Sequence, residues 1–332
     1  MLKRTLFFSN PYRLSVKNRQ LVIAPVETPN LGVSVSNKKC SNVETPNLGV
    51  SVSNNIPGGE NTPNLGVNTV PIEDIAFVVI EHNQIQISIP CLNTLNEHNV
   101  AVVFCNEKHM PTSMLLNLDG HHLQGELFRF QIQATEPLKK NLWKQTVEAK
   151  IKNQAAVLSY FGKNPAIVKQ YASEVKSGDV DNREGAAARE YWQTLFGNGF
   201  VRDRYGNAPN NLLNYGYILL RAAVARALTG SGLLATLGIH HHNRYNAFCL
   251  ADDIMEPYRP YIDMHVYQIW ESDPDCTVLT KEHKAALLQV LTCDVVMAKT
   301  KRPLMLALSQ TTASLSRCFS GEAKKIVYPQ IE

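Results

Sequence analysis

The sequence predicts an α+β fold in which a β-rich N-terminal domain, residues 1–119, is followed by an all-α C-terminal domain, residues 120–332. Two observations lead to this prediction. Short apolar segments bounded by turn residues fill the first third of the chain, whereas from His121 onward apolar residues recur every three or four positions. With 332 residues, of which 44% are hydrophobic, the chain can bury one large core or two ordinary ones.

The N-terminal third holds the predicted strands and one short helix. Apolar and mostly β-branched residues dominate its short segments, and polar turn residues separate them. The predicted strands are residues 20–24, 75–81, 85–89 and 100–105, and the predicted helix is residues 90–98.

A repeat interrupts this domain. The motif TPNLGV begins at Thr28, Thr45 and Thr62, a strict period of 17 residues. This period matches no common solenoid, and each copy offers only a leucine and a few valines to bury. We therefore interpret residues 25–68 as a loop insertion that arose by in-frame duplication. The functional alternative is a docking loop for a partner.

The rest of the chain carries the periodicity of helices. Apolar residues with a spacing of three and four mark each predicted helix, and several begin at a proline or an asparagine. The predicted helices are residues 123–133, 139–161, 165–175, 182–196, 209–228, 232–237, 246–256, 281–291 and 303–320.

Composition narrows the class of protein. The seven cysteines are dispersed without paired spacing, which indicates a reducing compartment. The opening residues hold only a very short apolar run, so no signal peptide is expected, and arginines interrupt the apolar region 215–239, so no membrane span is expected. We therefore expect a cytoplasmic location. Residues 177–280 contain eight arginines and no lysine, a bias that suits bidentate contact with phosphodiesters, although arginine also serves as a helix former.

Residues 238–260, GIHHHNRYNAFCLADDIMEPYRP, combine three consecutive histidines with three acids. Asn246 can cap the predicted helix, and Glu256 can share a helix face with Asp253 or with Asp252. Imidazole and carboxylate donors suit Mn²⁺ or Mg²⁺ better than a closed thiolate site. The alternative is a solvated acidic face, and a zinc site is disfavoured because no CxxC or HxxxH spacing accompanies the histidines.

The segment NREGAAAREYW provides a second candidate. Asn182 is a natural N-cap, and Glu184 lies in the first turn on the side of Ala188 and Tyr191. The small residues around Glu184 leave room for a DNA strand or for another helix. The alternative is that Glu184 only complements the helix dipole.

Several segments together resemble one family. They are LFFSNPYRLSVKNRQLVI, TVPIEDIAFVVIEHNQIQIS, VVFCNEKHMPTSMLL, NREGAAAREYW, LLNYGYILLR and GIHHHNRYNAFCLADDIMEPYRP. In this order they resemble the CRISPR-associated integrase, the first of the CRISPR-associated proteins, and most closely the kind found in type II systems. The resemblance covers nearly the whole chain and departs from the family only at residues about 25–68.

The resemblance implies a metal site formed by Glu184, His241 and Glu256, with Asp253 beside them and Mg²⁺ or Mn²⁺ as the cofactor. His241 follows the Gly-apolar-apolar spacer of the family, but here His240 occupies one of the apolar positions, so His240 stays the alternative ligand. The candidates for contact with DNA are Arg244, Asn211, Asn214, Tyr191 and Tyr217.

The resemblance also implies partners and a reaction. We expect a homodimer formed through the N-terminal domains, and two such dimers around a dimer of the small second CRISPR-associated protein, a 4:2 complex. The reaction expected is transesterification, in which the 3′-OH of prespacer DNA attacks the leader-repeat end of the CRISPR array. The type II RNA-guided effector nuclease is a further expected partner. The alternatives are a metal-dependent nuclease without integration activity and a non-catalytic DNA-binding subunit.

Overall fold

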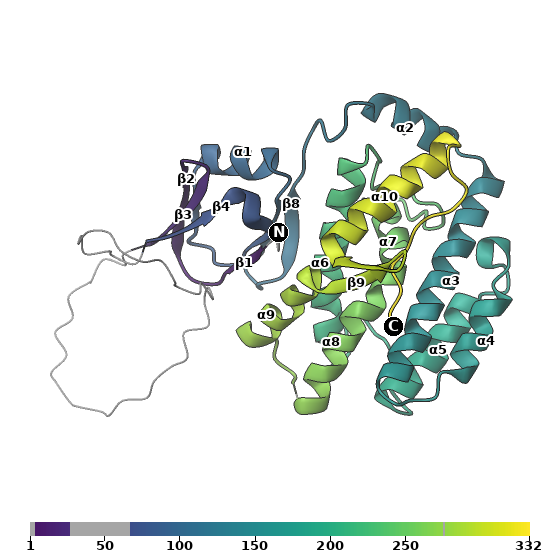
Figure 1. Ribbon diagram of the computed structural model, residues 1–332. Helices are drawn as coiled ribbons and strands as arrows, with labels where there is room; N and C mark the ends of the chain where they lie inside the picture. The colour runs from purple at the N-terminus through teal and green to yellow at the C-terminus, as the bar shows by residue number, and fades with distance from the viewer. Residues whose placement is uncertain (1–3, 27–66, 275) are drawn as a thin grey trace, which may run out of the picture. The chain divides into compact units, whose positions relative to one another are not determined.

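The computed structural model describes residues 4–26, 67–274 and 276–332. The chain forms two compact units, residues 6–113 and residues 114–332, and the second also includes the start of the first strand. Strands dominate the first unit and helices the second (Figure 1). The predicted α+β class, with a β-rich N-terminal part, is therefore confirmed.

Two four-stranded sheets and one helix build the first unit. One sheet has the order β1 (Arg4–Phe8), β5 (Ile75–Ile80), β7 (Ala101–Cys105) and β8 (Pro111–Leu115). The other has the order β4 (Asn68–Pro71), β3 (Gln20–Pro25), β2 (Tyr12–Lys17) and β6 (Gln86–Ile87). All six residues of β5 are buried, because this strand is covered on both faces.

The helix α1 (Ile89–Glu97) makes the crossover that a parallel strand pair requires. It follows β6 and leads into β7, which pairs in parallel with β5 so that Phe77 lies opposite Ala101. The predicted helix 90–98 and the predicted strands 75–81 and 100–105 are thus present. The strands β1, β2, β4 and β8 were not predicted, since their apolar residues alternate too briefly to stand out.

The TPNLGV repeat lies outside the described residues. The strands on either side of it pair with each other in an antiparallel ladder, in which Ile23 of β3 lies opposite Asn68 of β4. The predicted insertion therefore falls between two strands that are neighbours in the sheet.

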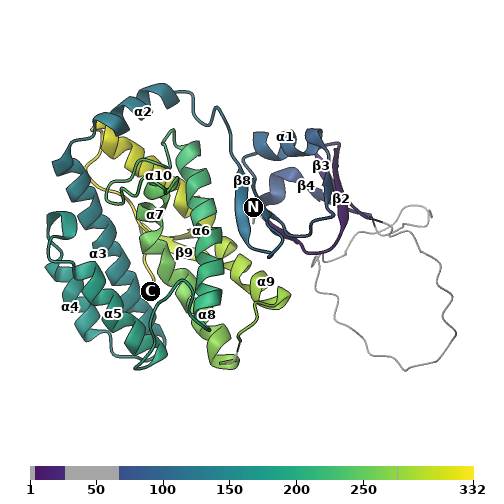
Figure 2. The same cartoon turned by 180° about the vertical axis from the view of Figure 1, so that it is seen from behind.

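The second unit is built from nine helices in its described residues. They are α2 (Gln124–Gln133), α3 (Glu136–Tyr160), α4 (Ala166–Glu174), α5 (Arg183–Phe196), α6 (Asn210–Gly230), α7 (Cys249–Met255), α8 (Arg259–Ser272), α9 (Lys281–Gln289) and α10 (Leu304–Ser320). The helices α3, α4 and α5 pack side by side, and α6 packs against α7, α8, α9 and α10 (Figures 1 and 2). The long α3 also contacts α7 and α8, which joins the two groups.

One observed helix was not predicted and one predicted helix is absent, for reasons of proline and glycine chemistry. The sequence predicts that Pro257 ends or kinks the helix 246–256, and α7 does end just before it, at Met255. The 3₁₀ turn Glu256–Tyr258 then leads directly into α8, a helix that was not predicted. Pro260 lies in the first turn of α8, where a missing backbone N–H costs nothing. Residues 232–237 do not form the predicted helix, because Gly232 takes a positive φ of 70° and ends α6 instead.

A hairpin in the second unit departs from the predicted all-α domain. The strand β9 (Asp294–Met297) pairs antiparallel with β10 (Thr300–Pro303), and Met297 lies opposite Thr300. The two turn residues, Ala298 and Lys299, both have positive φ, 50° and 64°, which is the backbone of a tight type I′ turn. This type of turn usually carries Asn-Gly or Asp-Gly. Because Ala298 and Lys299 are not such a pair, the hairpin was not predicted from the sequence.

The helix α6 carries most of the apolar region 215–239. Its residues are largely buried within the unit, as expected, and burial lowers the pKa of Arg226 to about 10. Within the described ranges, no helix combines the length and the apolar character needed to cross a membrane.

Candidate active site

Glu184 lies in the first turn of α5, where two polar side chains fix the start of the helix. Asn182 is the N-cap, as predicted, and accepts a hydrogen bond from the backbone N–H of Gly185 at 3.1 Å. The carboxylate of Asp179 accepts from the backbone N–H groups of Arg183 and Glu184 at 2.8 and 3.0 Å. These bonds satisfy N–H groups that have no partner inside the helix, so Glu184 projects from a rigid backbone.

Asp253 of α7 organises the histidine loop. Its carboxylate is fully buried and accepts backbone N–H bonds from Ile239, His240 and His241 at 2.7, 3.0 and 3.2 Å. Gly238 closes this turn, since a Cβ there would lie 2.4 Å from the carbonyl oxygen of His241 and 2.8 Å from Asp253 Oδ2. Asp253 was predicted to lie beside the site, and in the structure it holds the backbone of the histidine loop.

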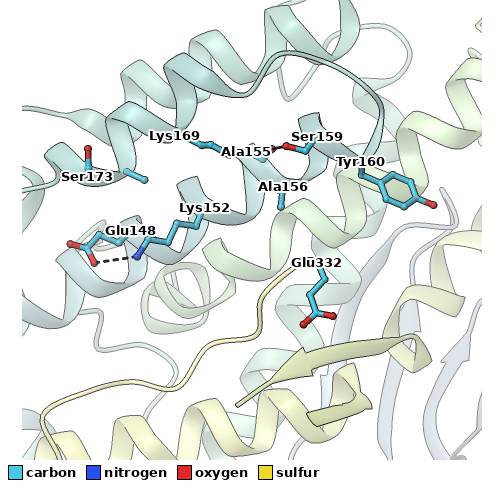
Figure 3. A pocket seen from close by; sticks show the side chains of 10 residues that line it. Glu148, Lys152, Ala155, Ala156, Ser159, Tyr160, Lys169, Ser173 and Glu332 are labelled. Carbon is cyan, nitrogen blue, oxygen red and sulfur yellow. Dashed lines mark hydrogen bonds and ion pairs between the residues drawn. The ribbon is translucent and has the colours of Figure 1, made fainter. Parts of the chain in front are cut away.

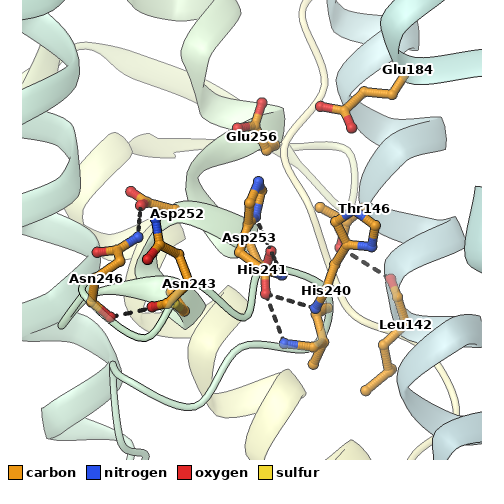
Figure 4. Close-up of polar contacts among 12 residues, drawn as sticks. Leu142, Thr146, Glu184, His240, His241, Asn243, Asn246, Asp252, Asp253 and Glu256 are labelled. Atoms are coloured by element: carbon orange, nitrogen blue, oxygen red, sulfur yellow. Dashed lines mark hydrogen bonds and ion pairs between the residues drawn. The ribbon is translucent and has the colours of Figure 1, made fainter. Parts of the chain in front are cut away.

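The same carboxylate orients the ring of His241. Asp253 Oδ1 lies 2.5 Å from Nδ1 of His241, and because an ionised carboxylate only accepts, the imidazole carries its proton on Nδ1. This hydrogen bond is the main cause of the raised pKa of His241. The ring points towards Glu256 (Figure 4), so Nε2 presents a lone pair on that side.

His240 has a different partner. Its ring stacks flat on the buried indole of Trp143, with 4.1 Å between the ring centroids, whereas His241 meets the same indole edge-on at 5.8 Å. Burial, followed by the charge of His241, lowers the pKa of His240. Of the two histidines left open by the sequence, His241 is the one with a carboxylate that fixes its tautomer.

Glu256 opens the 3₁₀ turn after α7 and is buried between two cations. Arg259 Nε lies 2.9 Å from its Oε1, and Lys150 Nζ lies 2.6 Å from its Oε2. Burial would raise the pKa of Glu256, but Arg259 and Lys150 outweigh that effect and lower it. Glu256 is therefore ionised when the site is assembled.

Lys150 links the two glutamates and was not singled out from the sequence. Its Nζ also lies 2.6 Å from Oε1 of Glu184, so the two carboxylate oxygens are no more than twice that distance apart. Its position in the sequence could have pointed to it, because Lys150 shares one face of α3 with the buried residues Trp143 and Val147. A lysine in an apolar stripe needs a buried partner.

Asp252 does not face the glutamates. Its carboxylate accepts two hydrogen bonds from Arg221, at 2.6 and 3.0 Å, and one from the side chain of Asn246 at 2.7 Å. The pairing of Asp252 with Glu256 that the sequence left open is thus not made. Asn246 does not cap α7 as predicted, since its side-chain oxygen accepts from the N–H of Phe248 ahead of the helix.

Tyr191 and Tyr217, expected to contact DNA, are buried and serve another role. Their hydroxyls donate to the two carboxylate oxygens of Asp263 on α8, at 3.0 and 2.5 Å. Arg259 lies over the ring of Tyr217 at 4.5 Å, which connects this cluster to Glu256. Burial raises the pKa of Asp263 to about 7 despite these donors.

The raised pKa of Asp263 makes a testable contribution to stability. Between pH 3.8 and about 7 the unfolded chain ionises this carboxyl first, so raising the pH through that window lowers the free energy of unfolding. Asp263→Asn is expected to remove this slope of about 1 kcal/mol per pH unit. Urea unfolding across the window checks it, with the exposed Asp273→Asn as a control. If the free energies of unfolding of Asp263→Asn and wild type differed by the same amount at every pH in the window, the prediction would be contradicted.

The remaining candidates for DNA contact divide into two groups. Asn211 donates to the carbonyls of Cys276 and Thr277, and Asn214 accepts from Arg202, so both hold neighbouring chain segments. Arg244 is exposed and lines a pocket of about 390 Å³ beside His241. The lining also includes Gln131, Lys139, His242 and Asn243 and contains no acid. This pocket is thus open to an anion at the edge of the site.

A larger pocket lies elsewhere, between α3 and α4 (Figure 3). It has a volume of about 780 Å³ and is lined by residues that include Glu148, Lys152 and Glu332. None of the predicted site residues lines it. The candidate site is therefore argued from the convergence of charged side chains and not from the size of a pocket.

The residues around Glu256 fit a divalent cation in their chemistry. Two carboxylates and one oriented imidazole are donors that Mg²⁺ or Mn²⁺ accepts. Across the part of the chain that the structure describes, no three His, Cys, Asp or Glu side chains already form a metal cluster. Lys150 lies between the two carboxylates. Oε2 of Glu256 is buried and forms the ion pair with Lys150, but among the described residues it has no partner that meets the geometry of a hydrogen bond.

Comparison with known proteins identifies the family to which the chain belongs. The model of the family "CRISPR associated protein Cas1" matches residues 60–275. The chain belongs to the Cas1 family. The CRISPR-associated endonuclease Cas1 of Neisseria meningitidis serogroup C (strain 8013) is 38% identical over 267 residues, which cover 80% of this chain and 88% of that protein. The resemblance to this family is confirmed, and so is the prediction of an enzyme of the DNA nuclease and integrase class.

Solved structures share the fold of this Cas1 chain. A casposase bound to integration product has a TM-score of 0.71 at 18% identity, covering 98% of this chain and 92% of that one. A Cas6-RT-Cas1–Cas2 complex has a TM-score of 0.64 at 17% identity, covering 100% of this chain and 36% of that one. At these identities the likeness concerns the fold.

Proposed function

We propose that this Cas1 protein is a metal-dependent DNA integrase that joins the 3′-OH ends of prespacer DNA to the CRISPR array by transesterification. The observation that carries the proposal is the convergence of Glu184, His241 and Glu256, from three separate segments, on one partly buried space (Figure 4). Exchange of one phosphodiester for another is nearly neutral in bond energy, so no nucleotide triphosphate is needed. The sequence contains no GxxxxGK[ST] loop to bind one.

Glu184, His241 and Glu256 would hold Mg²⁺ or Mn²⁺. The ion would polarise the scissile phosphate and stabilise charge on the attacking and leaving oxygens. Asp253 supports this set by holding the proton of His241 on Nδ1, which leaves Nε2 as the donor. Arg259 fixes the second oxygen of Glu256.

The pocket beside His241 would receive the DNA backbone. Arg244 and Lys139 line it and can each contact a phosphate oxygen, while Asn243 offers a neutral donor. Because contacts of this kind do not read bases, we expect binding to fall steeply with salt and to depend weakly on prespacer sequence.

The proposal includes partners. A fold neighbour is by its description a complex with Cas2, and another is a casposase on its integration product. We propose that this chain likewise binds DNA, forms a homodimer through its N-terminal unit, and assembles with the small second CRISPR-associated protein in a 4:2 complex. Contact with the type II effector nuclease and a cytoplasmic location stay predictions.

A strand-joining assay tests the function. The protein is incubated with the small second protein, Mn²⁺, labelled prespacer and a supercoiled plasmid carrying the leader and repeat. We expect label joined to the plasmid, and no joining when the ion is chelated. The control plasmid lacks the array. Nicked plasmid without joined label would show a nuclease, and DNA binding without either product would show a non-catalytic subunit.

A further inference from the structure

Lys150 is a buried cation at the centre of the candidate site. Its side chain is 11% exposed and projects from the middle of α3, a rigid helix of 25 residues. Removing an ammonium group from water is costly unless anions surround it. Lys150 meets that condition through Glu184 and Glu256, each 2.6 Å from Nζ, and these two carboxylates keep the pKa of Lys150 raised although burial acts in the opposite direction.

The ammonium group of Lys150 lies between two carboxylates and pairs with both. Glu184 contributes Oε1 and Glu256 contributes Oε2, while the other oxygen of Glu256 is already taken by Arg259. Without a cation between them, two ionised carboxylates this close in a partly buried site would repel each other. Lys150 therefore keeps the pair together.

We propose that Lys150 is a resident counter-ion that holds Glu184 and Glu256 in place and is exchanged for the divalent ion when that ion binds. The inference rests on the proposed function only in taking these two glutamates as ligands. It assigns Lys150 a positioning role, because the ammonium group acts through the two carboxylates.

This role has a consequence for affinity. A divalent ion must displace the ammonium group from both oxygens. Part of its binding energy is therefore used to break the two short ion pairs that Lys150 forms with Glu184 and Glu256. The apparent affinity of the site is thus lower than that of the same carboxylates without Lys150. In return the carboxylates stay close together before the ion arrives.

Direct measurement of Mn²⁺ binding tests the inference. Isothermal titration of the full chain is compared for wild type, Lys150→Gln and Lys150→Arg, without DNA and without an activity readout. We expect Lys150→Gln, which keeps N–H donors but loses the charge, to bind Mn²⁺ on the order of tenfold more tightly. Lys150→Arg, which keeps the charge, is expected to show no such gain. Lys152→Gln is the matched control, because Lys152 lies on the same helix, is exposed, and pairs with Glu148 rather than with a glutamate of the candidate site.

Thermal denaturation provides a second measurement on the same proteins. We expect Lys150→Gln to melt below wild type without metal, because two carboxylates lose their counter-ion, and to gain more than wild type from a fixed Mn²⁺ concentration. If Lys150→Gln does not fold, tighter binding by Lys150→Arg would still overturn the inference.

The outcomes separate the inference from the proposed function. Mn²⁺ binding that is lost in Glu256→Gln but unchanged or weaker in Lys150→Gln would overturn the role of Lys150 alone. Binding that Glu256→Gln leaves intact would overturn the proposed metal site, and the inference with it. Loss in Glu256→Gln together with a gain in Lys150→Gln supports both.

Discussion

Replacing Glu256 with glutamine is expected to lower the rate of strand joining by about 10³-fold, the scale on which a group that stabilises transition-state charge acts. Glutamine keeps the shape of the side chain but removes the negative charge that a divalent ion would need. It also leaves Lys150 and Arg259 without the carboxylate that lies between them. The measurement is the single-turnover rate of joining in saturating Mn²⁺.

A matched variant separates loss of chemistry from loss of fold. Glu148 on α3 also lies within ion-pair distance of two cations, Lys144 and Lys152, but outside the site. Glu148→Gln is therefore expected to join DNA at the wild-type rate. Circular dichroism and DNA binding must stay intact in Glu256→Gln for the comparison to hold. Joining by Glu256→Gln within threefold of wild type would remove Glu256 from the mechanism.

Replacing Asp253 with alanine is expected to produce the second large effect. The variant loses the acceptor for three backbone N–H groups and for the ring of His241, all at a fully buried position. Removing one partner of such a buried network costs about 3–5 kcal/mol of stability. Because His241 also loses the group that fixes its tautomer, the affinity for Mn²⁺ is expected to fall by about 10–100-fold. Chemical unfolding and Mn²⁺ titration measure the two effects.

The neighbouring aspartate is the control for this variant. Asp252 pairs with Arg221, whose side chain is partly exposed, and accepts from Asn246, whereas Asp253 accepts from the backbone of Ile239–His241. Asp252→Ala is expected to lose less stability and to bind Mn²⁺ like wild type. Equal effects of the two substitutions on Mn²⁺ affinity would show that Asp253 does not act through His241.

Local signals in the sequence led to the correct placing of much of the helical unit. The capping residue Asn182 predicted the start of α5, and the spacing of apolar residues predicted the course of α3 and α6. Such signals fail where a residue type is used in an unusual way. Pro260 lies in the first turn of α8, a helix that was not predicted, and Ala298 and Lys299 form a turn without glycine.

The candidate site was predictable only where its residues share a short segment or a motif. Glu184 and Glu256 lie in two such segments, but the set of Glu184, His241 and Glu256 was implied by the family resemblance, with His240 as the alternative ligand. In the structure the three side chains lie around one space. Lys150 and Asp263 were missed, because what makes them important is contact with residues on other helices. Tyr191 was a candidate for contact with DNA, but its hydroxyl is buried against Asp263. Periodicity does not show which face of a helix another helix covers.

The ladder between β3 and β4 bears on how this gene can change. Its register, from Gln20 opposite Pro71 to Ile23 opposite Asn68, is set entirely by residues outside the 17-residue repeat. On the interpretation of the repeat as a loop insertion, gain or loss of a copy is expected to change the free energy of loop closure by about 0.6 kcal/mol per doubling of loop length. We therefore expect variants that differ in copy number to keep the same pairing of β3 with β4.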